Sequence, residues 1–236
     1  MSRSKRYLSL IKSLPERRQF PLAEAVQKMK ECANAKFDET VDLAIRLGVD
    51  PKKQDQMVKG MVMLPFGTGK PIRVLVLTKG EKEKEAKEAG ADYVGFEEYI
   101  EKIKSGWLDF DVVVATPDAM PEVGKLGKIL GTRGLMPSPK TGTVTFDVGA
   151  AVRSLKAGKI QFKVDKTGNI HVIVGKASFE PKKLEKNILA VVAEVLKAKP
   201  ATAKGQYLRS ITISSTMGPA FKLDSKEIID LVGKEG

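Results

Sequence analysis

The hydrophobic pattern of the chain changes twice, and this change constrains the fold more than any other feature. Residues 37–47 alternate apolar and polar side chains, which is typical of a strand with one buried face. Residues 72–78 and 111–115 are instead continuous aliphatic runs, as in parallel strands covered on both faces. Alternation then returns in residues 159–174 and 208–214. We therefore expect the middle of the chain to fold separately from its two ends.

The middle segment predicts alternating strands and helices. The order strand, helix, strand, helix, strand is typical of a small Rossmann-like parallel sheet, and a further helix closes it. The expected elements are residues 72–78, 81–89, 91–95, 97–104, 111–115 and 150–157.

The two ends predict one α+β domain. Residues 159–174 resemble a hairpin around a glycine-containing turn, and a basic amphipathic helix is expected before Pro15, although a mitochondrial presequence has the same composition. The other expected elements are helices at 21–33 and 180–198 and strands at 55–64 and 220–223. The fold class is thus α/β with two domains. Residues 1–67 and 159–236 form a discontinuous α+β domain, and residues 68–158 form an inserted Rossmann-like module.

Positive charge is concentrated in the two ends. The chain has 41 Lys and Arg against 29 Asp and Glu, a net charge of +12. Residues 1–67, 68–157 and 158–236 carry surpluses of five, one and six positive charges. Such a surplus suggests a polyanionic partner bound by the ends, although basic side chains can also serve solubility alone.

Residue counts exclude several classes of site. Cys32 and His171 are the single cysteine and histidine, so no internal disulfide, multi-cysteine zinc site or His–His metal pair is possible. The sequence contains no run of 18 apolar residues, so we expect no membrane-spanning helix. Asp38, Glu39 and Asp42 suggest a metal site, but alternation places only Asp38 and Asp42 on one face of the expected strand. No third ligand is evident there, so we expect no metal.

Two glycine-containing motifs give weak signals. Residues 66–70 suggest a phosphate loop, but Leu64 and Pro71 occupy positions where that motif needs glycine and a hydroxyl residue. We expect no cofactor, and a nucleotide-dependent enzyme remains the alternative. Gly131 and Gly134 have the G-x-x-G spacing of K-homology domains, but the helix-strand frame of those domains is absent, and close packing of this loop is the alternative explanation.

Two polar segments of the end domain are candidate contacts for RNA. His171 follows the turn that contains Lys166, Thr167 and Asn169, and no acidic partner for it is evident from the sequence. It is either a surface residue or a hydrogen-bond donor to phosphate or ribose. Residues 214–219 supply hydroxyls, a methionine and a glycine, which suit either a strand end or close approach of RNA.

Several spaced motifs resemble the large-subunit ribosomal protein L-one family, in its bacterial form. The strongest is residues 126–145, LGKILGTRGLMPSPKTGTVT. The resemblance extends through KFDETV at 36–41, GKIQF at 158–162 followed by Asp165 and Lys166, and SSTMGP at 214–219. It covers essentially the whole chain.

The resemblance implies a non-enzymatic, cytoplasmic protein of the large ribosomal subunit. It implies binding to ribosomal RNA at the mobile stalk, help in releasing deacylated tRNA from the exit site, and repression through its own operon mRNA. We expect a monomer away from the ribosome and no membrane association. A basic protein-interaction adaptor is the remaining alternative.

Matching positions give most of the expected RNA contacts. The family's motifs fall on Lys36, Phe37 and Thr40 of the first strand and on Thr216, Met217 and Gly218, with Ser210 on the strand leading to them. The hairpin adds Lys166, Thr167, Asn169 and His171 from the residue pattern alone.

Overall fold

The structure is a computed structural model that describes residues 4–12, 14, 19–80 and 82–235. Its mixed helices and sheets confirm the α/β class. The chain separates into two compact units, which we call the terminal unit (Met1–Gly69 and Ile160–Gly236) and the inserted unit (Lys70–Lys159). Pro15 and Glu81, where two expected helices end and begin, lie outside the described residues.

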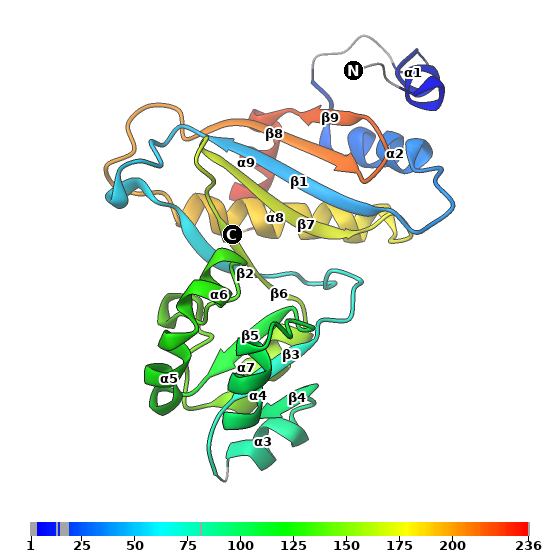
Figure 1. Cartoon of the computed structure of the whole chain (residues 1–236). Coiled ribbons are helices and arrows are strands. Elements are labelled where there is room, and N and C mark those ends of the chain that lie inside the picture. Colours follow the sequence, from blue (N-terminus) through cyan, green and yellow to red (C-terminus); the bar gives the residue numbers. More distant parts are fainter. Residues whose placement is uncertain (1–3, 13, 15–18, 81, 236) are drawn as a thin grey trace. The chain divides into compact units, whose positions relative to one another are not determined.

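An antiparallel sheet forms the centre of the terminal unit (Figure 1). Its strands are ordered β7, β1, β8, β9, with bounds Asn169–Lys176, Thr40–Leu47, Leu208–Ser215 and Ala220–Leu223. Ala44 of β1 lies opposite His171 on one side and Thr212 on the other. The early segment therefore supplies one strand of this sheet, β1, which lies between two strands of the late segment.

Three helices cover one face of this sheet. They are α2 (Leu22–Cys32), α8 (Pro181–Lys197) and α9 (Ser225–Glu235), and Figure 1 shows α8 running behind the strands. Leu43 and Ile45 point from β1 into the resulting core and are fully buried. Each such side chain contributes about 1.5–3 kcal/mol through burial. Helix α1 (Lys5–Lys12) has no buried residue and lies at the edge of the unit.

The expected hairpin over residues 159–174 is wrong in its pairing. Strand β6 (Lys159–Lys163) pairs with β2 (Lys59–Met63), which follows the short helix η1 (Gln54–Gln56), whereas β7 pairs with β1. A single bridge, Val164 to Ile170, remains of the hairpin. Alternation identifies a strand and its buried face, but it does not identify the partner strand.

The inserted unit contains the expected parallel sheet. Strand β3 (Val74–Leu77) lies between β4 (Tyr93–Gly95) and β5 (Val112–Ala115), and both pairings are parallel. The four residues of β3 are all buried, in agreement with the continuous aliphatic run. The remaining elements are α3 (Lys82–Glu88), α4 (Glu97–Lys104), η2 (Pro117–Ala119), α5 (Met120–Lys125), α6 (Gly127–Thr132), η3 (Pro139–Thr141) and α7 (Val148–Lys156).

The two glycines of the G-x-x-G spacing are not closely packed themselves, although the loop that follows them is. Gly131 lies in α6 and Gly134 follows it. A Cβ added at either position would meet no atom within 4 Å, whereas Leu135 and Met136 pack against the core of the inserted unit. Of the two glycines, Gly134 alone has a backbone that favours glycine, with φ of 71°.

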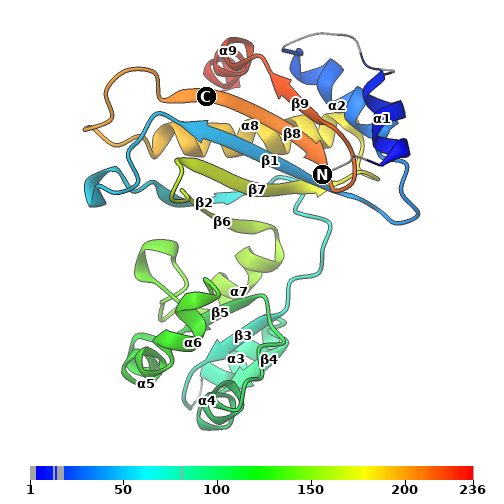
Figure 2. The same cartoon turned by 45° about the horizontal axis from the view of Figure 1, so that its top comes forward.

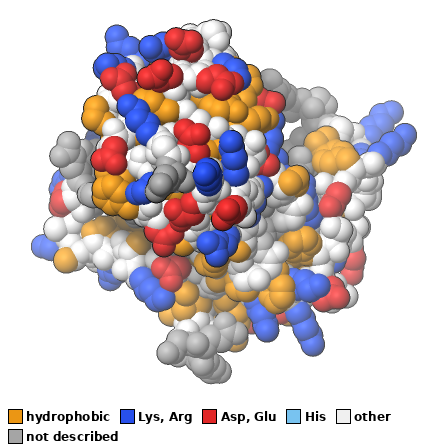
Figure 3. All heavy atoms as spheres, turned by 90° about the horizontal axis from the view of Figure 1, so that it is seen from below, with side chains coloured by type: hydrophobic (Ala, Val, Ile, Leu, Met, Phe, Trp, Pro, Cys, Tyr) orange, Lys and Arg blue, Asp and Glu red, His pale blue; other side chains and the backbone are white. Residues whose placement is uncertain are grey.

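Figure 3 shows one face of the molecule, on which lysine and arginine are interspersed with acidic side chains.

Candidate nucleic-acid interface

The face of the four-stranded sheet opposite the three helices is polar, and we call it the open face (Figure 2). Residues at every second position of each strand form it, because side chains alternate along a strand. They are Thr40, Asp42, Ala44 and Arg46 of β1, Asn169, His171 and Ile173 of β7, Ser210, Thr212 and Ser214 of β8, and Ala220 and Lys222 of β9. Hydroxyl groups outnumber cations, so this face offers hydrogen bonds more than dense positive charge.

At one end of the open face, segments far apart in the sequence meet. We call residues 35–40, 176–178 and 215–218 together the corner. The N–H of Thr40 donates to Oγ1 of Thr216 at 3.0 Å, and the N–H of Thr216 donates to the carbonyl of Thr40 at 3.0 Å. Lys176 donates from Nζ to Oγ1 of Thr40 at 2.9 Å. The structure therefore brings the early and the late candidate residues together.

Lys36 and Phe37 belong to the corner, although they are not on the first strand as expected. Strand β1 begins at Thr40, and the preceding residues are held by other contacts. The carboxylate of Asp38 accepts two hydrogen bonds from Ser178, one from its N–H at 3.1 Å and one from its hydroxyl at 2.8 Å. The side chain of Phe37 is 55% exposed, and that of Met217 in the neighbouring segment is 50% exposed.

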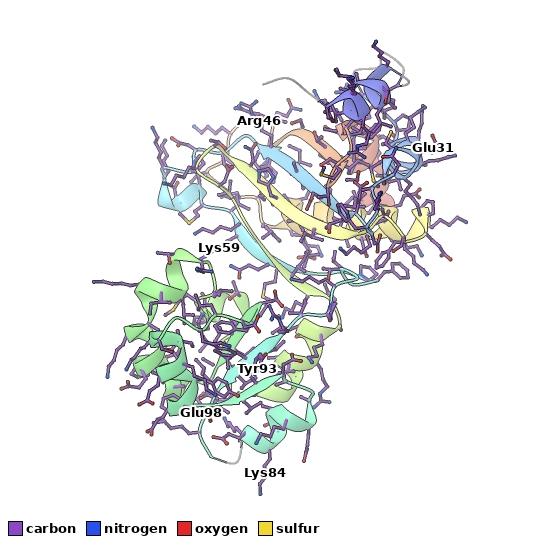
Figure 4. All side chains as sticks on the ribbon, turned by 45° about the vertical axis from the view of Figure 1, so that its right-hand side comes forward. Glu31, Arg46, Lys59, Lys84, Tyr93 and Glu98 are labelled. Atoms are coloured by element: carbon purple, nitrogen blue, oxygen red, sulfur yellow. The ribbon has the colours of Figure 1, made fainter. Side chains whose placement is uncertain are left out.

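The turn with Lys166 and Thr167 lies at the other end of β1. Asn169 pairs with Arg46, which is labelled on this sheet in Figure 4. Six residue steps separate Arg46 from Thr40, about 20 Å along a strand. The candidates thus form two clusters joined by the open face, with His171 between them and Ser210 opposite Arg46.

The hydrogen-bonding groups of the turn serve its own structure. Asp165 accepts the N–H of Thr167 at 2.8 Å and of Asn169 at 2.7 Å, as well as the hydroxyl of Thr167. These bonds lower the pKa of the Asp165 carboxyl to about 2, and the backbone N–H of Asn169 has the largest effect. Lys166 is exposed beside this anion. An ionised carboxylate here disfavours phosphate, so the turn is the weaker cluster.

His171 has an acidic neighbour after all. Its Nε2 lies 3.9 Å from Oδ2 of Asp165, six residues earlier across the turn. The sequence contained this signal, because the two residues flank a tight turn. The open-face residues Arg46, Thr212 and Ser214 could also have been predicted, since they continue the alternation of Thr40 and Ser210.

Other classes of site receive no support from the described residues. No group of three or more His, Cys, Asp or Glu side chains in ranges 4–12, 14, 19–80 and 82–235 could hold a metal ion. None of the helices in this part of the chain combines the length and the apolar character needed to span a bilayer.

Comparison with known proteins identifies similar chains. The model of the ribosomal protein L1p/L10e family matches residues 29–219. A large ribosomal subunit protein uL1 from Protochlamydia amoebophila is 56% identical over 232 residues, which cover 98% of each chain. One of the same name from Chlorobaculum tepidum is 56% identical over 225 residues, covering 95% of this chain and 97% of its own.

Proposed function

The chain belongs to the ribosomal protein L1p/L10e family, and from this premise we propose that it is a constituent of the large ribosomal subunit that binds ribosomal RNA. Its contacts are the corner and the open face. The observation that carries this proposal is the direct pairing of Thr40 with Thr216, which joins the segment that contains Lys36 and Phe37 to the segment that contains Met217 and Gly218. Cations there bind phosphates, while hydroxyls and exposed apolar side chains fit ribose and bases.

The alternatives are less well supported. The relatives are named as ribosomal proteins, so the Rossmann-like unit is better explained as a scaffold than as the site of a nucleotide-dependent enzyme. A basic adaptor would bind RNA no better than other polyanions. The test is to add heparin, a sulfated polyanion, to the chain with large-subunit ribosomal RNA bound. If heparin displaces the RNA when its sulfate concentration only equals the phosphate concentration of the RNA, the chain does not recognise RNA specifically.

Replacing Lys36 by alanine is expected to weaken the salt dependence of RNA binding. Lys36 is exposed in the corner, and each phosphate neutralised contributes about one unit to the slope of log K against log salt. The measurement is filter binding of ribosomal RNA over a salt series. Lys84→Ala in the inserted unit is the control (Figure 4). An unchanged slope with unchanged affinity would remove Lys36 from the interface.

We extend the proposal to repression of the chain's own operon mRNA. This role rests on the family resemblance and requires that the mRNA present a similar structure to the same surface. Ribosomal RNA and operon mRNA should therefore compete for one site, each displacing the other completely. Simultaneous binding of both RNAs would show that repression uses a different surface.

We also propose that the inserted unit moves during release of deacylated tRNA from the exit site. The chain passes between the units twice, between Gly69 and Lys70 and between Lys159 and Ile160, and three glycines lie next to these crossings. Gly67, Gly69 and Gly158 have φ of 64°, 73° and 108°, and such backbone is accessible mainly to glycine. These positions suit a hinge, and the tRNA itself is assigned from the resemblance.

A further inference from the structure

A buried carboxylate lies beneath the proposed RNA-binding corner. Glu39 is 1% exposed, yet its two oxygens accept backbone N–H groups from two different segments. Oε1 accepts from Ala35 at 3.0 Å, and Oε2 accepts from Met217 at 2.9 Å. One side chain thereby joins the segment that carries Lys36 and Phe37 to the late segment that carries Met217.

The position of Glu39 in the sequence explains its burial. It has the same parity as Val41, Leu43 and Ile45, so it points toward the core at the end of the buried face. Burial opposes its ionisation, but hydrogen bonding, with the N–H of Met217 as the largest contribution, and the charge of Arg6 outweigh that effect and lower its pKa. The carboxylate therefore remains charged at neutral pH and accepts both bonds.

Arg6 of helix α1 also holds the backbone of Met217, which Glu39 binds at its N–H. Its Nη2 donates to the carbonyl oxygen of Met217 at 2.6 Å, and its Nη1 donates to Oδ1 of Asn34 at 2.6 Å. Met217 is thus held at both its N–H and its carbonyl, while half of its side chain faces solvent. Both backbone polar groups of Met217 are therefore hydrogen-bonded in the chain without a ligand.

We propose that Glu39 and Arg6 are positioning residues for RNA binding. They fix the backbone of Met217 and the segment from Ala35 to Phe37, so that the side chains of Met217 and Phe37 already have the positions in which they contact RNA. This inference rests on the proposed function. Ordering the contact residues in the free protein lowers the entropy lost on association. The carboxylate of Glu39 repels a polyanion directly, but by this positioning it favours the binding of RNA overall.

The variant Glu39→Gln separates positioning from charge. Glutamine has one side-chain oxygen, and its NH₂ group cannot accept a hydrogen bond, so one of the two N–H groups loses its acceptor. We expect about tenfold weaker binding of purified large-subunit ribosomal RNA to the full chain, with an unchanged salt slope. Charge alone predicts the opposite, because the substitution removes a repulsive anion.

Glu31→Gln is the matched control. It makes the same substitution at an exposed side chain of α2, which belongs to neither the corner nor the open face. Binding should be unchanged or tighter. Amide hydrogen exchange of the free chains is the second measurement, and exchange at Ala35 or Met217 should be faster in Glu39→Gln only. Wild-type affinity in Glu39→Gln, or weaker binding with unchanged exchange at both amides, would overturn the role of Glu39.

Arg6→Gln tests the same fixation without altering the core, since α1 has no buried residue. It should weaken binding several-fold at constant salt slope. A slope reduced by about one unit would instead assign Arg6 to a phosphate, and unchanged binding would overturn its role altogether. If the wild-type chain does not bind ribosomal RNA, the proposed function itself fails, which is a distinct result.

Discussion

Gly218→Ala is expected to weaken binding of ribosomal RNA by about ten- to a hundredfold. A Cβ built on Gly218 falls on Oγ of Ser215, closer than non-bonded atoms approach. Ser215 is only 3% exposed, so its side chain cannot swing into solvent. Overpacking of this kind costs about 1–3 kcal/mol, and the corner relieves it by moving the backbone that contacts RNA. A loss of about 1.4 kcal/mol in binding is tenfold in affinity.

Removing the obstructing hydroxyl should rescue this variant. After Oγ, the next atom that the new Cβ meets is the Ser215 Cβ at 3.6 Å, an ordinary contact. The double variant Ser215→Ala/Gly218→Ala should therefore bind more tightly than Gly218→Ala. Gly131→Ala is the control, because its Cβ would enter open space in the inserted unit. Wild-type binding by Gly218→Ala would show that the corner does not contact RNA at this position.

Truncating Phe37 or Met217 to alanine is expected to weaken RNA binding about tenfold each while the melting temperature stays unchanged. Both side chains are about half exposed, so their removal leaves the core intact. Stacking of an aromatic side chain on a base contributes about 1–3 kcal/mol, and a methionine packed on a ribose contributes in the same way. Fluorescence titration with ribosomal RNA measures the loss, and calorimetry measures the melting temperature.

Ile229→Ala provides the matched control for these truncations. Ile229 lies on α9 and is 42% exposed, yet it belongs to neither the corner nor the open face. Its truncation should alter neither affinity nor melting. If all three variants bind equally well, exposed apolar side chains of the corner take no part in recognition.

Local patterns predicted most elements of the fold. Helix α4 and strand β9 have the expected bounds, because helical spacing and alternation are properties of neighbouring residues. Helix α9 is not among the expected elements, although Ile228, Leu231 and Val232 have helical spacing. The pairing of β6 with β2 could not be inferred, because it joins strands about a hundred residues apart.

The candidate site was predictable only in part. Family motifs selected Thr40 and Thr216, and the structure places them in contact, although their binding of RNA stays a prediction. The residue pattern placed Thr167 and Asn169 in the same surface, whereas they bind Asp165 at the other end of the strand. Glu39 shows the limit most clearly. Its parity indicates burial, but its two N–H partners come from the tertiary structure.

Hydrogen–deuterium exchange of the full chain, alone and saturated with purified large-subunit ribosomal RNA, tests the central claim most directly. We predict that RNA slows amide exchange in residues 35–47 and 208–222, which carry the corner and the open face, and leaves residues 70–159 unchanged. Protection confined to residues 70–159, with unchanged exchange at the corner, would contradict the account.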